Sequence, residues 1–207
     1  VGIKTFIKQH NIIDFNLLFN VFPKKIYPFD YQTYFNSPER FIMVTSNCLT
    51  GEAVYLEEKQ DEKRVLDICV ATCSLPLLCP IAYVDGIPMV DGGVCDALPI
   101  RKSEADGNSR NVIVLTRNKG YRKPVKQQKL PGFVFRKYPE LRRELMLRYQ
   151  RYNETIEYIE QLEADGKALV IRPIRDVVVD RIERDVDKLT SFYEEGYACA
   201  KAAFEKK

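Results

Sequence analysis

The sequence contains a single histidine, His10, and this scarcity limits the catalytic chemistry open to the chain. A Ser-His-Asp triad needs a histidine beside both of its partners, and zinc sites commonly use histidine as a ligand. His10 lies in an N-terminal stretch with no clear secondary-structure pattern. We interpret it as a surface or helix-terminal residue, and we expect any hydrolytic mechanism here to work without histidine.

Cysteine pairs of the C-x-x-C type are absent as well. None of the six cysteines forms the C-x-x-C spacing that is typical of zinc sites. Four of them lie in apolar surroundings, so we expect buried free thiols in a reducing compartment rather than a disulfide framework. The cysteines are Cys48, Cys69, Cys73, Cys79, Cys95 and Cys199.

Long apolar runs are missing too, so no stretch predicts a membrane-spanning helix. No secretory signal is visible, although the sequence begins at Val1 rather than at a methionine. With 45% hydrophobic and 29% charged residues, the composition is that of a globular chain and not of a disordered one. We expect a cytoplasmic protein, able to lie peripherally at a membrane.

The formal net charge of +3 is too small to predict a nucleic-acid-binding protein. A basic cluster nevertheless lies between residues 117 and 129, with six basic residues and no acidic one. It is either a solvated loop, which we favour, or a patch that attracts anionic head groups. Its members are Arg117, Lys119, Arg122, Lys123, Lys126 and Lys129.

The first half of the chain predicts short strands joined by turns. Residues 40–58 have the composition of a β-hairpin, and two further strands flank Asp85-Gly86, a strong two-residue turn signal. Apolar residues at steps of three and four predict a helix over 61–73. A short helix is expected near 14–19, followed by an irregular aromatic segment.

The second half alternates helices and strands. Helices are predicted over 99–105, 139–166 and 187–204, and strands over 111–117 and 168–173. The apolar run in 111–117 favours a strand buried on both faces, as in a parallel sheet. We therefore expect an α/β fold with a largely parallel sheet covered by helices, forming one domain over residues 1–207.

Asp91-Gly92-Gly93 is the candidate site in this pattern. It follows "IPMV", where a strand ends, and open α/β folds place functional groups at strand ends. Two glycines allow positive φ and leave an open surface beside the carboxylate. Taken alone, the triplet is a common turn, and a structural role is then the better interpretation.

The sequence on either side of the triplet favours a functional role instead. "ATCSLPLLCPIAYVDGIPMVDGGVCDALPIRKSEADG", followed by "NVIVLTRNKGYRK", resembles the second half of a bacterial patatin-like phospholipase domain. The stretch "YPELRRELMLRYQRYNETIEYIEQLEADGKALVIRP" resembles the long helix and strand that close the bacterial form. The resemblance extends over nearly the whole chain, with several ordered elements matching in order.

The resemblance implies a lipid acyl hydrolase that uses a Ser-Asp dyad and needs neither cofactor nor metal. Asp91 matches the catalytic aspartate, and Gly92 and Gly93 match the glycines of the active-site turn. The serine of the family lies in G-x-S-x-G on a strand-to-helix elbow, and a glycine-rich loop forms the oxyanion hole. The implied partner is a lipid or another acyl ester, not nucleic acid; oligomeric state is not implied.

The sequence departs from the family because it contains no G-x-S-x-G and no glycine-rich oxyanion loop. In the family both lie N-terminal to the matched region. We therefore expect this chain to be the C-terminal portion of a patatin-like domain, incomplete at its N-terminus and inactive by itself. Ser74, which precedes Leu75-Pro76, is interpreted as a structural residue rather than a substitute nucleophile.

Two alternatives stay open. The chain could be a non-catalytic regulatory or lipid-binding module of the same fold, or its active form could transfer the acyl group to an acceptor other than water. Binding of an anionic membrane surface through the basic cluster is a further possibility.

Overall fold

The computed structural model describes residues 14–125, 130–175, 179 and 183–205. His10 lies outside the described residues, as do Lys126 and Lys129 of the basic cluster. The chain forms two compact units, unit 1 with residues 1–98 and 126–148, and unit 2 with residues 99–125 and 149–207. The assignment of residues 1–207 to one domain stays a prediction.

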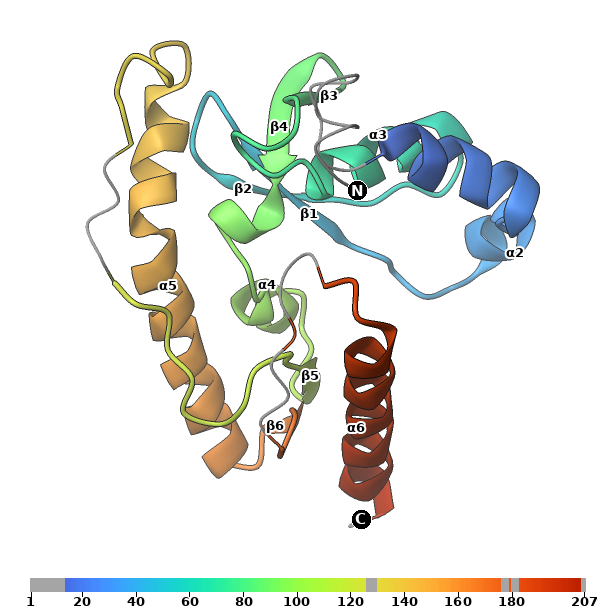
Figure 1. The fold of residues 1–207 in the computed structure, drawn as a ribbon, viewed down its shortest axis with the longest axis vertical. Helices are drawn as coiled ribbons and strands as arrows, with labels where there is room; N and C mark the ends of the chain where they lie inside the picture. The colour runs from blue at the N-terminus through green and yellow to red at the C-terminus, as the bar shows by residue number, and fades with distance from the viewer. Residues whose placement is uncertain (1–13, 126–129, 176–178, 180–182, 206–207) are drawn as a thin grey trace. The chain divides into compact units, whose positions relative to one another are not determined.

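Each unit contains one sheet (Figure 1). Unit 1 holds η1 (Leu17–Ile26), α2 (Tyr31–Asn36), β1 (Met43–Asn47), β2 (Ala53–Leu56), α3 (Glu62–Thr72), β3 (Ala82–Val84), β4 (Ile87–Asp91), η2 (Gly92–Val94) and the start of α5 (Pro139–Ala164). Unit 2 holds α4 (Ile100–Ala105), β5 (Asn111–Val114), the rest of α5, β6 (Ala168–Ile171) and α6 (Val186–Glu205). No helix in the described ranges has the length and apolar character of a membrane span.

The sheet of unit 1 is antiparallel, with strand order β2-β1-β4-β3. Both predicted hairpins are confirmed, and Asp85 and Gly86 both adopt positive φ, 53° and 78°, in the turn between β3 and β4. The prediction of a largely parallel sheet is not confirmed. Strands joined by such short turns must run in opposite directions, and among the strands of the described residues only β5 and β6 pair in parallel.

Helix α3 covers one face of this sheet. Asp61 caps its N-terminus, where its carboxylate accepts the backbone N–H of Lys63 at 2.8 Å and that of Arg64 at 3.3 Å. Ile68 and Ala71 of the helix pack with Met43, Val84 and Met89 of the strands. The helix predicted over 61–73 is therefore confirmed, and its apolar stripe forms the first core of the unit.

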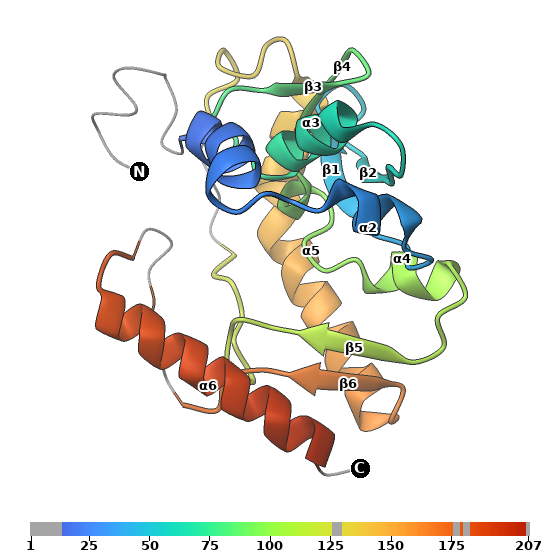
Figure 2. The ribbon, with the colours of Figure 1, turned by 90° about the vertical axis from the view of Figure 1, so that its right-hand side faces the viewer.

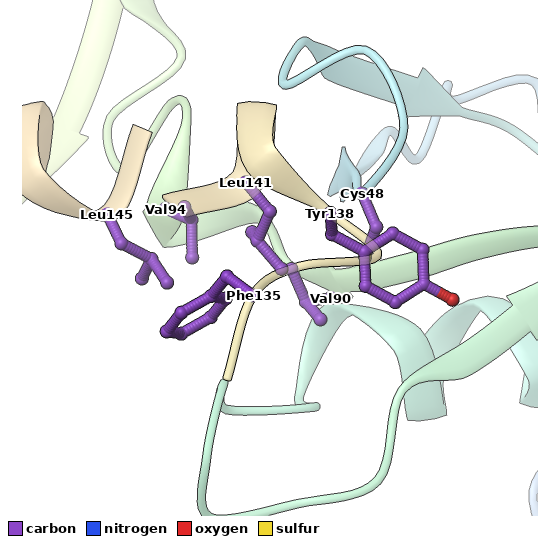
Figure 3. Close-up of a cluster of buried hydrophobic side chains, with 7 residues drawn as sticks. All are labelled: Cys48, Val90, Val94, Phe135, Tyr138, Leu141 and Leu145. Carbon is purple, nitrogen blue, oxygen red and sulfur yellow. The ribbon is translucent and has the colours of Figure 1, made fainter. Parts of the chain in front are cut away.

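A second core lies on the opposite side of β4. Met89 belongs to the core under α3, whereas the next residue, Val90, belongs to the second cluster, because successive strand residues point to opposite faces. Figure 3 shows this cluster. It contains Cys48, Val90, Val94, Phe135, Tyr138, Leu141 and Leu145. The strand that ends at Asp91 is thus packed on both faces.

In unit 2, β5 and β6 run side by side as a two-stranded parallel sheet (Figure 2). The helices predicted over 99–105, 139–166 and 187–204 are present as α4, α5 and α6. The prediction that the first strand is buried on both faces is wrong. Val112 and Val114 of β5 are 56% and 67% exposed, while Asn111 and Ile113 are partly buried.

The N-terminal segment is more helical than expected. The helix predicted near 14–19 extends as η1 to Ile26 with wide, π-type turns, and it includes Pro23. The segment that was expected to be irregular contains α2. Asp30 caps this helix, because its carboxylate accepts the Thr33 N–H at 2.9 Å.

Arg64 of α3 ties together two turns of the sheet. Its guanidinium reaches Asp85 in the turn between β3 and β4, at 2.8 Å, and Glu58 after β2, also at 2.8 Å. Glu58 accepts three backbone N–H groups as well, from Lys59, Gln60 and Asp61. The Arg64 contact, reinforced by these N–H donors, lowers the pKa of Glu58 to about 2.

Because folding lowers the pKa of Glu58, the free energy of unfolding should depend on pH. The Glu58 pKa falls from 4.5 to about 2 on folding, so its contribution is present above pH 4.5 and is lost as the pH falls towards 2. The contribution has an upper limit of about 3 kcal/mol at neutral pH. Glu58→Gln should therefore lower the free energy of unfolding at neutral pH, measured by urea denaturation, and the deficit should shrink in acid.

Glu57→Gln is the matched control for this prediction. Glu57 pairs with Arg40 at 2.9 Å, but the two side chains are 31% and 56% exposed, so the pair is worth at most about 1 kcal/mol. A deficit for Glu58→Gln that stays constant as the pH falls towards 2 would contradict the assignment.

Candidate functional site

Asp91 is the last residue of β4, and two hydrogen bonds fix its main chain. Its N–H donates to the carbonyl of Ser74 at 3.0 Å, and its carbonyl accepts the hydroxyl of Ser46 at 2.9 Å. Ser46 belongs to β1, whose residue Thr45 pairs with Asp91 in the sheet. The position of the aspartate is thus set by the sheet and by the segment after α3.

The carboxylate of Asp91 caps the short helical turn that follows it. Its Oδ1 accepts the backbone N–H of Gly93 at 2.7 Å, and the side chain is partly buried. A carboxylate bound in this way has a fixed orientation at the end of the strand. The tight turn predicted at Asp91-Gly92-Gly93 is therefore present as η2 (Gly92–Val94).

The two glycines are required for a reason other than the expected one. Neither Gly92 nor Gly93 has positive φ. Instead, a Cβ at Gly92 would lie 2.3 Å from the carbonyl oxygen of Val44, and one at Gly93 would lie 3.0 Å from Oδ1 of Asp91. Gly92 therefore permits the close approach of β1, and Gly93 leaves room for the carboxylate.

Two thiols lie close enough to Asp91 to be influenced by its charge. Burial raises the pKa of Cys73, and the negative charge of Asp91 raises it further. Burial likewise raises the pKa of Cys79, and Asp91 again adds to the effect. Both thiols therefore stay protonated at neutral pH and are poor nucleophiles.

The thiol of Cys73 provides a measure of the charge on Asp91. Reagent can reach Cys73 because the residue as a whole is exposed, although its thiol is partly desolvated, and its raised pKa keeps the reactive thiolate scarce. Asp91→Asn removes the negative charge and should lower this pKa, so iodoacetamide should modify Cys73 faster at fixed neutral pH. Peptide mass spectrometry gives the rate at Cys73, with Cys69, whose raised pKa has no Asp91 contribution, as the internal control. An unchanged rate at Cys73 would contradict the electrostatic contact.

The comparison with known families bears on this turn directly. A family model described as "Patatin-like phospholipase" matches residues 3–102, a range that contains β1 to β4 and the Asp91 turn. The first half of the chain is thus similar to the patatin-like phospholipase family. A second model, "Domain of unknown function (DUF6363)", matches residues 138–206. No curated protein matches the chain.

Ser74, which lies in the segment that matches the patatin-like family, is not placed to act as a nucleophile. Ser74 is fully buried, and its hydroxyl donates to the carbonyl of Val70 at 2.8 Å. Its own carbonyl binds the N–H of Asp91. The structural role expected for Ser74 is confirmed, and that role includes holding the candidate base in place.

Two residues that stabilise the turn after Asp91 were not identified from the sequence. Ser46 is buried, and its hydroxyl accepts the N–H of Cys95 at 3.2 Å as well as donating to Asp91. Tyr55 of β2 donates to Asp96 at 2.7 Å. Burial raises the pKa of Tyr55, and the Asp96 hydrogen bond raises it further. Neither residue stands out in the sequence, because the contacts join segments that are distant along the chain.

The basic cluster is partly neutralised within unit 2. Arg122 forms an ion pair with Glu160 of α5 at 2.6 Å. The ammonium of Lys123 lies 3.8 Å from the ring centroid of Tyr152. These two cations therefore serve contacts inside the unit. Within the described residues there is no group of side chains suited to hold a metal ion, and all six cysteines are free thiols.

Proposed function

We propose that the protein is a lipid acyl hydrolase in which Asp91 is the general base for a serine nucleophile. One observation carries this proposal. Within the segment that matches the patatin-like phospholipase family, the carboxylate at the end of β4 is oriented by the Gly93 N–H, on a turn that requires glycine at Gly92. A general base needs this kind of fixed geometry first, because proton transfer requires contact with the donor.

The proposed reaction has two steps. Asp91 accepts the proton of a serine hydroxyl as the serine attacks the acyl carbonyl, and it passes this proton to the leaving alcohol as the ester C–O bond breaks. Asp91 then activates water, which hydrolyses the acyl-serine. Backbone N–H groups stabilise the oxyanion in both steps. The printed sequence contains no G-x-S-x-G, so the proposal requires such a serine on a segment joined to these residues, and the chain alone is expected to be inactive.

The setting of this activity is also part of the proposal. Six free cysteines favour a reducing compartment such as the cytoplasm. The substrate is an acyl ester of a lipid, and transfer of the acyl group to another alcohol would use the same dyad. The exposed Arg117 and Lys119 can bring the protein to an anionic membrane surface.

One competing function, a non-catalytic regulatory or lipid-binding module, is favoured only if the whole protein lacks G-x-S-x-G as the printed sequence does. Two assays on the whole protein separate the functions. An enzyme should release nitrophenol from p-nitrophenyl acyl esters and fatty acid from phosphatidylcholine vesicles. A binding module should sediment with the vesicles and release neither product. Turnover that survives loss of every serine of the whole protein would contradict the proposed nucleophile.

A further inference from the structure

Unit 2 contains a cavity of about 720 Å³, partly open to solvent, between β6 and α6. Most of its wall belongs to the segment that matches the family of unknown function, residues 138–206. Its size falls in the range of small-molecule sites, roughly 300–1,000 Å³. The activity proposed for Asp91 leaves this cavity unexplained.

Much of the wall of the cavity is apolar. Leu169 and Ile171 of β6 lie on one side, and Cys199, Ala202 and Ala203 of α6 lie on the other. The cavity exists because α6 presents small side chains at these three positions, where larger ones would fill the space against the strand. Such a surface suits an alkyl chain.

A buried carboxylate holds the strand end and the helix together. Glu195 of α6 is 5% exposed, and its Oε1 accepts the backbone N–H groups of Ile174 and Arg175, each at 2.9 Å. Ile174 and Cys199, one turn along α6 from Glu195, both line the cavity. The two walls are thus fixed before any ligand binds, which lowers the entropic cost of binding.

The charge on the cavity wall is +1 among the described residues. Three charged residues line it, Lys119, Glu163 and Arg172. Arg172 and Glu163 form an ion pair with each other. The exposed Lys119 is left as the net charge of this wall, and it also lies close enough to Glu160 of α5 to help lower the pKa of that carboxyl. A ligand complementary to this wall carries an apolar chain and a single negative charge.

We propose that this cavity binds the anion of a long-chain fatty acid, with the alkyl chain against Ile171 and Ala203 and the carboxylate at Lys119. The assignment depends on the cavity alone and does not require Asp91 to be catalytic. A lipid acyl hydrolase would release this ligand as its product, so the site would hold product away from the reaction.

Equilibrium binding to the whole protein tests this proposal. The fluorescence of cis-parinaric acid reports binding, and oleate, kept below its micelle-forming concentration, should displace it. Oleyl alcohol has the same chain without the charge, and acetate has the charge without the chain. Acetate should hardly compete, and oleyl alcohol should compete about threefold to tenfold more weakly than oleate.

Two variants with matched controls locate the site. Ala203→Leu fills the cavity and should weaken binding at least about tenfold, whereas Ala198→Leu places the same side chain on an exposed position of α6 and should leave affinity unchanged. Lys119→Gln should weaken oleate binding about threefold to tenfold, without changing competition by oleyl alcohol. Lys201→Gln, away from the cavity, should have no effect.

Circular dichroism and thermal unfolding show whether Ala203→Leu folds. If Ala203→Leu does not fold, the proposal is tested by Lys119→Gln alone, which should weaken binding of oleate and leave binding of oleyl alcohol unchanged. Failure of the wild-type protein to bind, or equal affinity of wild type and Lys119→Gln for oleate, would overturn the proposal. None of these results depends on ester hydrolysis, so they leave the function proposed for Asp91 untouched.

Discussion

Replacing Gly92 with alanine should destabilise unit 1 by about 3 kcal/mol or more, an overpacking cost at the upper end of what single substitutions cause. The added Cβ would lie 2.3 Å from the carbonyl oxygen of Val44 and 2.6 Å from its carbonyl carbon. These are backbone atoms of β1, so they cannot move away as a flexible side chain can. The pairing of β1 with β4, which positions Asp91, would have to change. Urea denaturation followed by circular dichroism measures the loss.

Gly132→Ala is the matched control for Gly92→Ala. A Cβ at Gly132 meets no atom within 4 Å, and its backbone does not adopt positive φ. This variant should change the free energy of unfolding by less than about 0.5 kcal/mol. Equal stability of Gly92→Ala and Gly132→Ala would show that the close approach of the two strands is not as described.

Asp91→Asn should lower ester hydrolysis by about 10²-fold to 10⁴-fold in a protein that carries the serine, the usual range for loss of a general base. Asparagine has the same shape, and its amide oxygen still accepts the Gly93 N–H, so the turn should be kept. The amide cannot accept the serine proton at neutral pH. The loss should therefore appear in kcat, with the free energy of unfolding little changed.

Asp85→Asn is the control that separates the two Asp-Gly turns. Asp85 has positive φ, which asparagine tolerates, and its carboxylate pairs with Arg64 while 54% exposed. The variant should cost little stability and leave hydrolysis within about twofold of wild type. Equal losses of activity in Asp85→Asn and Asp91→Asn would point to a general effect on the fold.

Local features of the sequence were sufficient to predict most of the elements. The Asp85-Gly86 pair predicts a two-residue hairpin because both residues tolerate positive φ, and the structure has that turn. Val65 and Ile68 predict the buried face of α3, and both are buried. The turn at Asp91 was predicted because a strand pattern stops at two glycines, although neither glycine adopts positive φ.

Long-range pairing was not predictable in the same way. The antiparallel pairing of β1 with β4 joins strands that are not consecutive, and no local pattern specifies it. The requirement for Gly92 arises from Val44 on that partner strand, so it is invisible in the Asp-Gly-Gly triplet. The exposure of Val112 and Val114 was missed because an entirely apolar run gives no alternation to read.

Pre-steady-state hydrolysis of a p-nitrophenyl ester tests the role of Asp91 most directly, because the initial burst of nitrophenol reports attack by the serine alone. The protein must carry its G-x-S-x-G segment, and wild type, Asp91→Asn and Asp85→Asn are compared at one neutral pH. If Asp91 takes the serine proton, the burst rate should fall at least about 100-fold in Asp91→Asn and stay near wild type in Asp85→Asn. A burst of undiminished rate in a folded Asp91→Asn protein would contradict this role.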